Sequence, residues 1–310
     1  MQISGTPFFQ RGTAPAVSPG RFGRIVLRIV PLLRTFKLAR LKRQRASNRG
    51  SRATAYVPDA IGGASERSFE IDFAALERRG FIGRPTIRRK LSRDMRALRH
   101  RLLNRIDAFE LDRTFSQQRR RNVVMVSSAW AGEGKTFTAV NLTLSLILEG
   151  NFHVLLIDAN IGRSDIEKLF NIDVEDGVTE FLNDSGNDLA EYLWRARNGK
   201  LTILPAGGRL SSPWDLFRGD RMSQLLDDVS TRYPDRIVII DSPAMLASGD
   251  AVVLANHADH IVMVVQAGRT AQSALEDALD MIVDHEKVSL VLNRCNEGDR
   301  LTNGSNYSYG

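Results

Sequence analysis

Residues 122–138 read Asn-Val-Val-Met-Val-Ser-Ser-Ala-Trp-Ala-Gly-Glu-Gly-Lys-Thr-Phe-Thr. Val123–Val126 is a short apolar run typical of a buried parallel strand. The residues that follow the loop place apolar side chains at helical spacing, among them Val140, Leu144 and Leu148. A strand, a glycine-rich loop with Gly-Lys-Thr and a helix, in this order, wrap backbone N–H groups around the phosphates of a nucleotide. The stretch therefore predicts a nucleotide-binding α/β domain.

The side chains of this loop have separate expected roles. Lys135 would reach the β- and γ-phosphates, and the Thr136 hydroxyl would complete the shell of a Mg²⁺ ion. Ala129 stands where the usual pattern has its first glycine, which the looser form of the motif allows. The residues expected to contact the nucleotide are Ala131, Gly132, Glu133, Gly134, Lys135, Thr136 and Phe137.

Five further apolar runs follow the loop. Stretches with helical periodicity separate them, and such an alternation predicts parallel strands with helices on both faces of the sheet. The runs lie at residues 153–157, 201–204, 236–241, 261–265 and 288–292. We therefore predict a doubly wound, mainly parallel α/β sheet.

Two of these strands end in an aspartate. Asp158 follows Val-Leu-Leu-Ile, and Asp241 follows Ile-Val-Ile-Ile. Because such sheets bind ligands beyond the carboxyl ends of their strands, both carboxylates are expected beside the loop. Asp241 is the better candidate for holding Mg²⁺, directly or through water, while Asp158 would bind the metal too or accept a proton from an attacking hydroxyl or water. With Lys135, the two aspartates form the predicted catalytic set.

The charge of the chain is concentrated near its start. The 310 residues carry a net charge of +7, yet residues 1–58 contain twelve Lys or Arg and no acidic residue, which leaves about −5 for the rest. Within residues 21–45, basic and apolar residues alternate. Three interpretations stay open: a segment that lies on an anionic membrane surface, a solvated basic tail, or a contact with nucleic acid, which is the least favoured.

Four regions are expected along the chain. Residues 1–66 form a basic extension that is disordered or lies on a membrane. Residues 67–116 form an arm and a long amphipathic helix, which Thr86 can cap and whose apolar stripe predicts an intramolecular packing face. Residues 117–298 form the nucleotide-binding domain, and residues 299–310 form a mobile tail.

Cysteine usage and hydropathy bear on the compartment. Cys295 is the only cysteine, so an intramolecular disulfide is excluded and a reducing compartment is favoured. No apolar run approaches the roughly 20 residues that span a bilayer, and we find no pattern of a cleaved signal. We expect a cytoplasmic protein, held at the inner face of the plasma membrane if the basic segment binds lipid.

Three motifs resemble those of a known family. Ala-Gly-Glu-Gly-Lys-Thr, Val-Leu-Leu-Ile-Asp-Ala-Asn and Ile-Val-Ile-Ile-Asp-Ser-Pro look like the Walker A, A′ and B motifs of bacterial tyrosine kinases. The resemblance covers residues 68–310 and implies a P-loop NTPase fold of the MinD/ParA-like type. It is closest to the cytoplasmic autokinases tied to exopolysaccharide synthesis and export, including the exosortase-associated branch.

The resemblance implies an activity and partners. ATP and Mg²⁺ would support autophosphorylation of tyrosines in the C-terminal tail, here Tyr307 and Tyr309, between subunits of a homo-oligomeric ring. Asn293 matches the position of an asparagine that contacts the adenine. A membrane-spanning polysaccharide co-polymerase would activate the kinase.

Departures from the family pattern keep a second interpretation open. Asn160 and Gly162 stand where the family has a second aspartate and an arginine, and Arg93 stands where its oligomerising helix has a glutamate. These residues favour an ATP-binding switch or scaffold in the same pathway, with little or no kinase activity. A partitioning-type ATPase that uses its basic extension on DNA is the third interpretation.

Overall fold

The structure is a computed structural model of the chain. It describes residues 28–30, 67–83, 89–110, 122–149, 152–161, 163–183, 188–208, 220–232 and 236–295. Several predictions lie outside these residues: the cap at Thr86, the role of Gly162, the acceptor tyrosines Tyr307 and Tyr309, and most of the basic segment 21–45.

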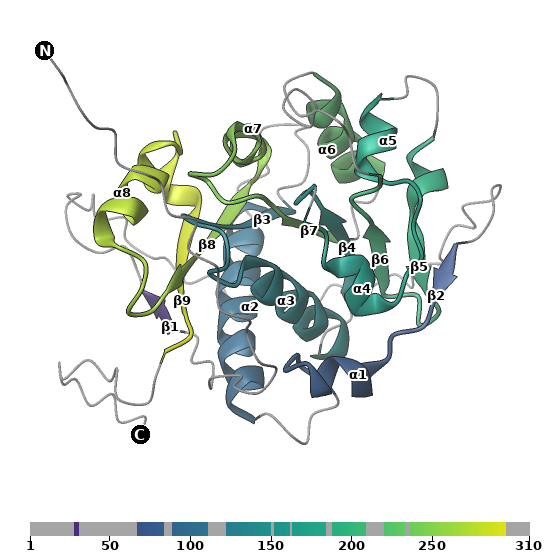
Figure 1. The fold of residues 1–310 in the computed structure, drawn as a ribbon, viewed down its shortest axis with the longest axis horizontal. Helices are drawn as coiled ribbons and strands as arrows, with labels where there is room; N and C mark the ends of the chain where they lie inside the picture. Colours follow the sequence, from purple (N-terminus) through teal and green to yellow (C-terminus); the bar gives the residue numbers. More distant parts are fainter. Residues whose placement is uncertain are drawn as a thin grey trace, which may run out of the picture.

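A nine-stranded sheet runs through the molecule, in the spatial order β1-β9-β8-β3-β7-β4-β6-β5-β2 (Figure 1). All neighbours from β9 to β6 are parallel, whereas β1 runs antiparallel to β9 and β5 antiparallel to β6. The strands are β1 (Arg28–Val30), β2 (Ser68–Phe69), β3 (Val123–Ser128), β4 (His153–Asp158), β5 (Trp194–Ala196), β6 (Leu201–Leu204), β7 (Arg236–Asp241), β8 (His260–Gln266) and β9 (Val288–Asn293). The prediction of a mainly parallel α/β sheet is confirmed; β1, β2 and β5, of two or three residues each, were not predicted.

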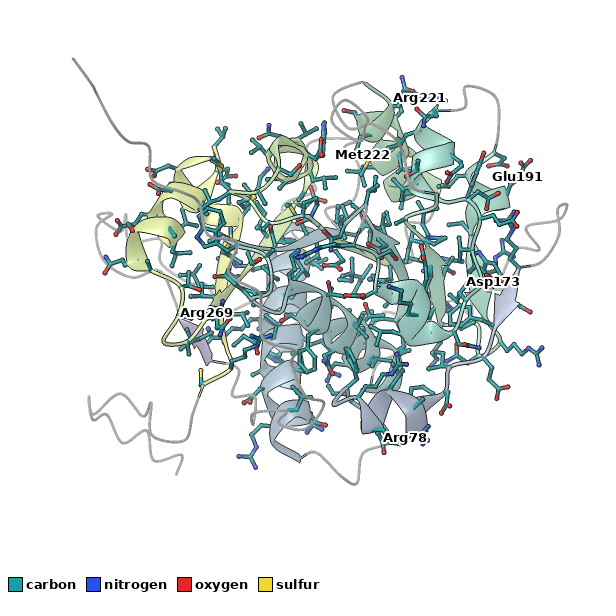
Figure 2. All side chains as sticks on the ribbon, in the orientation of Figure 1. Arg78, Asp173, Glu191, Arg221, Met222 and Arg269 are labelled. Atoms are coloured by element: carbon teal, nitrogen blue, oxygen red, sulfur yellow. The ribbon has the colours of Figure 1, made fainter. Side chains whose placement is uncertain are left out.

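Helices cover both faces of this sheet (Figure 1). The first layer contains α1 (Phe73–Arg78), α2 (Arg89–Glu110), α3 (Lys135–Glu149) and α4 (Ile166–Phe170). The second contains α5 (Val178–Asn183), η2 (Leu189–Tyr192), α6 (Asp220–Arg232), α7 (Gly249–His257) and α8 (Gln272–Asp280), with η3 (His285–Lys287) after it. Arg78 of α1 and Met222 of α6 mark the two sides in Figure 2. Within the part of the chain described, no helix is long and apolar enough to cross a bilayer.

The central strands supply both cores. In β3, Val124 and Val126 join the core under α1–α4, while Val123 and Met125 join the core under α5–α8. This alternation follows from the two-residue period of a strand. Because both faces are covered, Val123–Val126 form an uninterrupted apolar run, which is the pattern that predicted the strand.

The long helix α2 packs within the molecule. Its apolar residues, spaced by three and four, are buried in the same core as α3: Leu91, Met95, Leu98, Leu102 and Ile106. The guanidinium of Arg99 donates to the backbone oxygen of Ser145 in α3 at 2.8 Å. The apolar stripe is therefore an intramolecular packing face. Phe69, Leu76 and Phe81 of the preceding arm belong to this core as well.

Candidate functional site

The loop between β3 and α3 lies at the carboxyl edge of the sheet. Gly132 and Gly134 have φ angles of 87° and 100°, in the left-handed region that favours glycine. A Cβ on Gly134 would also lie 2.0 Å from Nδ2 of Asn293. The two glycines thus permit the sharp turn that ends at Lys135, the first residue of α3.

A buried glutamate holds this loop from within. Glu133 is 4% exposed. Its Oε2 accepts the backbone N–H of Trp130 at 3.1 Å, and its Oε1 accepts the hydroxyl of Thr270. That hydroxyl also accepts the backbone N–H of Gln266, the last residue of β8, at 3.0 Å. Glu133 therefore ties the loop to the neighbouring strand.

Asn293 braces the same loop from the end of β9. It is buried, its Nδ2 donates to the backbone oxygen of Glu133 at 2.8 Å, and its Oδ1 accepts the backbone N–H of Arg294 at 2.8 Å. Among the described residues only one N–H of the amide donates a hydrogen bond, which leaves the other for a further acceptor. The contact with adenine implied by the family resemblance stays a prediction.

Asp158 and Asp241 lie next to each other on adjacent strands. The register of β4 and β7 pairs their Cα atoms directly. Both side chains are buried. β7 also pairs with β3, where Asp241 stands opposite Val126, two residues before the strand ends. The sheet therefore brings the two carboxylates together beside the loop, as the sequence predicts.

One oxygen of Asp241 has no protein partner. Among the described residues, no group donates a hydrogen bond to its buried Oδ1, whereas the carboxylate does receive one from Thr136. A buried acceptor left unsatisfied is costly and calls for a ligand. A carboxylate and a threonine hydroxyl next to bound phosphates are ligands that Mg²⁺ takes in nucleotide sites. The residues present fit a magnesium ion held by Thr136 and Asp241.

Both oxygens of Asp158, in contrast, have donors from the chain. Oδ1 accepts the backbone N–H of Asn160 at 3.0 Å, and Oδ2 accepts the hydroxyl of Ser164 at 2.8 Å. The Asn160 side chain turns away and donates to the backbone oxygen of Arg163 at 3.3 Å. The loop after β4 therefore fixes the orientation of the Asp158 carboxylate, and its role as a metal ligand stays a prediction.

The electrostatics of the pair follow from burial. Burial, and then the charge of Asp158, raise the pKa of Asp241 to about 8. The hydrogen bond from Thr136 and the charge of Lys135 act in the opposite direction on that pKa. Burial raises the pKa of Asp158 to about 6, against the lowering effect of the hydrogen bonds from Ser164 and Asn160. A cation bound between the loop and the pair would relieve the crowding of negative charge.

Some of the other predicted loop residues are exposed, and others are buried. Ala131 and Gly132 are exposed, and Lys135 is 7% exposed. Phe137 packs its ring on Phe81 of the arm, with centroids 5.0 Å apart. Its side chain thus packs against the core, so any contact of Phe137 with a phosphate would come from its backbone.

Two residues of the site were missed by sequence reasoning. Ser164 lies within the loop that follows Asp158, where a hydroxyl close to a strand-end acid is a weak but readable signal. Thr270 contacts Glu133 across 137 residues of chain. No local sequence pattern predicts such a contact.

Comparison with known proteins places this geometry in a family. Residues 121–293, more than half of the chain, match the family model described as an AAA domain. The chain is 31% identical over 195 residues to the tyrosine-protein kinase YwqD of Bacillus subtilis, covering 63% of this chain and 79% of YwqD. It is 32% identical over 161 residues to the tyrosine-protein kinase Etk of Escherichia coli, covering 52% of this chain but 21% of Etk.

Solved kinase domains are similar as well. The VpsO kinase domain has a TM-score of 0.50 and 33% identity, covering 57% of this chain and 86% of that domain. The kinase domain of Escherichia coli ETK has a TM-score of 0.58 and 24% identity, covering 81% of this chain and 88% of that domain, and supports the fold. The chain therefore belongs to the bacterial tyrosine-protein kinases, whose nucleotide-binding unit is a P-loop domain.

Proposed function

We propose that the protein is an ATP- and Mg²⁺-dependent tyrosine autokinase that phosphorylates Tyr307 and Tyr309 and regulates exopolysaccharide synthesis and export. The observation that carries the catalytic part is the buried Oδ1 of Asp241, which receives no hydrogen bond from the described residues and lies beside Asp158 at the carboxyl edge of the sheet. The likeness to YwqD and VpsO supports the kinase activity. The resemblance of the three motifs to exopolysaccharide autokinases supports the pathway.

Each residue of the site has a role in phosphoryl transfer. Lys135 and the loop backbone bind the triphosphate, and Thr136 and Asp241 hold Mg²⁺, which neutralises charge on the phosphates when bound. The phenol oxygen of a tyrosine forms a bond to the γ-phosphorus while the bond to the bridging oxygen breaks and ADP leaves. The phenol proton passes to Asp158, whose raised pKa suits a general base.

Mapping of the modified residues tests this proposal. The purified chain is incubated with ATP and Mg²⁺, in parallel with the Lys135→Met variant, and peptides are analysed by mass spectrometry. We expect phosphate on Tyr307 and Tyr309 in the wild type and none in the variant. Wild-type protein that hydrolyses ATP but leaves both tyrosines unmodified, even with its membrane partner present, would contradict autokinase activity.

The alternative is an ATP-dependent switch or scaffold in the same pathway. Its support is the position of Asn160, whose side-chain amide donates to Arg163 rather than presenting a second carboxylate to the site. Under this alternative the protein binds ATP and hydrolyses it slowly. An assay that finds nucleotide-dependent assembly without phosphotyrosine would favour it.

The proposed setting is an assembly at the membrane. We propose a homo-oligomer that acts with a membrane-spanning polysaccharide co-polymerase, on the strength of the family resemblance. Residues 21–45 would contribute by binding anionic lipid. Sedimentation with anionic liposomes, comparing the intact chain with one lacking residues 1–58, tests the lipid contact; equal binding by both would remove it.

A further inference from the structure

Trp130 is an exposed indole on a fixed backbone. It is 50% exposed, and the other exposed large apolar residues in the described part of the chain are Met281 and Val283. Its backbone N–H donates to Oε2 of Glu133 at 3.1 Å, and its backbone oxygen accepts the hydroxyl of Ser128 at 2.7 Å. The main chain on both sides of the ring is therefore held in place while the ring faces solvent.

Trp130 belongs to the phosphate loop, between the end of β3 and Gly132. The backbone N–H of Leu246 donates to the oxygen of Ala129 at 3.2 Å, directly before Trp130. Leu246 belongs to the segment that leaves β7 after Asp241. The backbone next to Trp130 is therefore tied to the segment that follows β7, the strand that ends at Asp241.

A large exposed aromatic on a rigid support is typical of a recognition contact. Tryptophan buries a large area at little conformational cost and is enriched at binding sites. An aromatic partner stacks on it or meets its edge, with an affinity gain of up to about tenfold beyond the area buried. An apolar ring that stays in water without such a partner has no stabilising role for the fold.

The C-terminal segment supplies such an aromatic partner. Residues 303–310 read Asn-Gly-Ser-Asn-Tyr-Ser-Tyr-Gly and carry no charged side chain. Charge therefore cannot select this segment, and the two tyrosine rings are its only sizeable apolar groups. Recognition by an aromatic surface is the chemistry that remains.

The described part of the chain ends close to the phosphate loop. Asn293 contacts Glu133 of the phosphate loop, and Cys295 follows two residues later. Tyr307 follows Cys295 by twelve positions, a span of at most about 40 Å. The chain length therefore allows the acceptor to reach the phosphate loop.

We propose that Trp130 binds the aromatic ring of the acceptor tyrosine and directs its phenol oxygen toward the γ-phosphate. This inference rests on the proposed kinase function. It assigns acceptor selection to a residue of the phosphate loop itself, apart from the groups that bind the nucleotide. A second consequence is that the site prefers tyrosine in an uncharged sequence.

Steady-state kinetics with a separate acceptor tests the proposal. The enzyme is the full chain with Tyr307→Ala and Tyr309→Ala, and the acceptor is a peptide of residues 302–310. Trp130→Ala should raise the KM for the peptide about tenfold, with less than a twofold change in the KM for ATP. Trp130→Phe should restore most of the affinity, and Val283→Ala, which removes an exposed apolar residue in the turn after α8, should have no effect.

Two results would overturn the proposal. One is a peptide KM that Trp130→Ala leaves unchanged. The other is a parallel rise in the KM for ATP, which would mean that the indole contacts the nucleotide.

A binding measurement separates failure of this inference from failure of the kinase function. The fluorescence of Trp130 is obtained as the difference between the wild type and Trp130→Phe. In the presence of a non-hydrolysable ATP analogue, the peptide should quench this difference. A peptide with both tyrosines replaced by alanine should not. If no enzyme labels the peptide, the proposed function fails, yet this quenching still supports the aromatic contact and its absence still contradicts it.

Discussion

Asp158 and Asp241 are the same residue type at the same place on adjacent parallel strands, but their hydrogen-bond partners differ. Asn160 and Ser164 bind both oxygens of Asp158, while Oδ1 of Asp241 has no partner in the described structure. The difference arises in the segments that follow each strand. After β4 the chain folds back over its carboxylate, whereas after β7 Ser242 turns its hydroxyl to the oxygens of Val126 and Pro243.

This contrast separates two functions. A carboxylate that the chain already holds has a fixed direction and suits proton transfer. A carboxylate with a vacant coordination position suits a metal. A pair of buried acids without a cation is also a destabilising feature, which the protein retains because ligand binding offsets it.

The largest effect is expected from replacing Asp241, the proposed ligand of the metal. Asp241→Asn should lower the rate of tyrosine phosphorylation about a thousandfold, because the amide cannot replace a charged ligand of Mg²⁺. The affinity for Mn²⁺ in the presence of an ATP analogue, measured by paramagnetic resonance, should fall with it. Asp280→Asn, an exposed acid of α8, serves as the control. Undiminished Mn²⁺ affinity in Asp241→Asn would assign the metal to another residue.

A smaller effect is expected from removing a hydrogen bond to Asp158, the proposed base. Ser164→Ala removes the donor to Oδ2 of Asp158. Because that hydrogen bond lowers the pKa of Asp158, the variant should shift the acid limb of the pH–rate profile to higher pH and slow the reaction about tenfold at neutral pH. Ser164→Thr retains the hydroxyl and should restore the profile. An unshifted acid limb in Ser164→Ala would argue against Asp158 as the base.

Stability should change in the direction opposite to activity. Without nucleotide or metal at pH 8, Asp241→Asn should raise the melting temperature by about 5 °C, since it removes a buried charge next to Asp158. Calorimetry of the two proteins measures the difference. Adding Mg²⁺ and an ATP analogue should reverse the order, because only the wild type gains the stabilisation of binding.

The last prediction concerns the pH dependence of the stability of the metal-free protein. In the native state the pKa of Asp241 is raised to about 8, so between its ordinary value and that pH the native state binds more protons than the unfolded state. The metal-free wild type should therefore lose stability as the pH rises from about 4 to 8. Asp241→Asn should show a flatter dependence over this range. Equal slopes would mean that Asp241 does not carry the excess proton.

Sequence reasoning located the centre of the sheet and missed its edges. The strands β3, β4 and β7 are buried on both faces, so their apolar runs are long and unbroken. β2 and β5 have two and three residues, too few for any period to be visible. Their pairing depends on the arm, where the backbone N–H of Arg195 donates to Arg67 and that of Arg197 to Phe69.

Local chemistry was enough to find the loop, the lysine and the two strand-end acids. Apolar runs specify strands, glycines permit positive φ angles, and parallel strands bring their carboxyl ends to one edge, so these residues are readable within a few positions of each other. The division of labour between Asp158 and Asp241 is of another kind. It depends on which groups of distant or folded-back segments arrive within hydrogen-bond distance, as Thr270 does at Glu133 and Ser164 at Asp158. The contact of Thr270 with Glu133 forms only when the sheet has packed, because no period or propensity of the chain encodes the meeting of two side chains 137 residues apart.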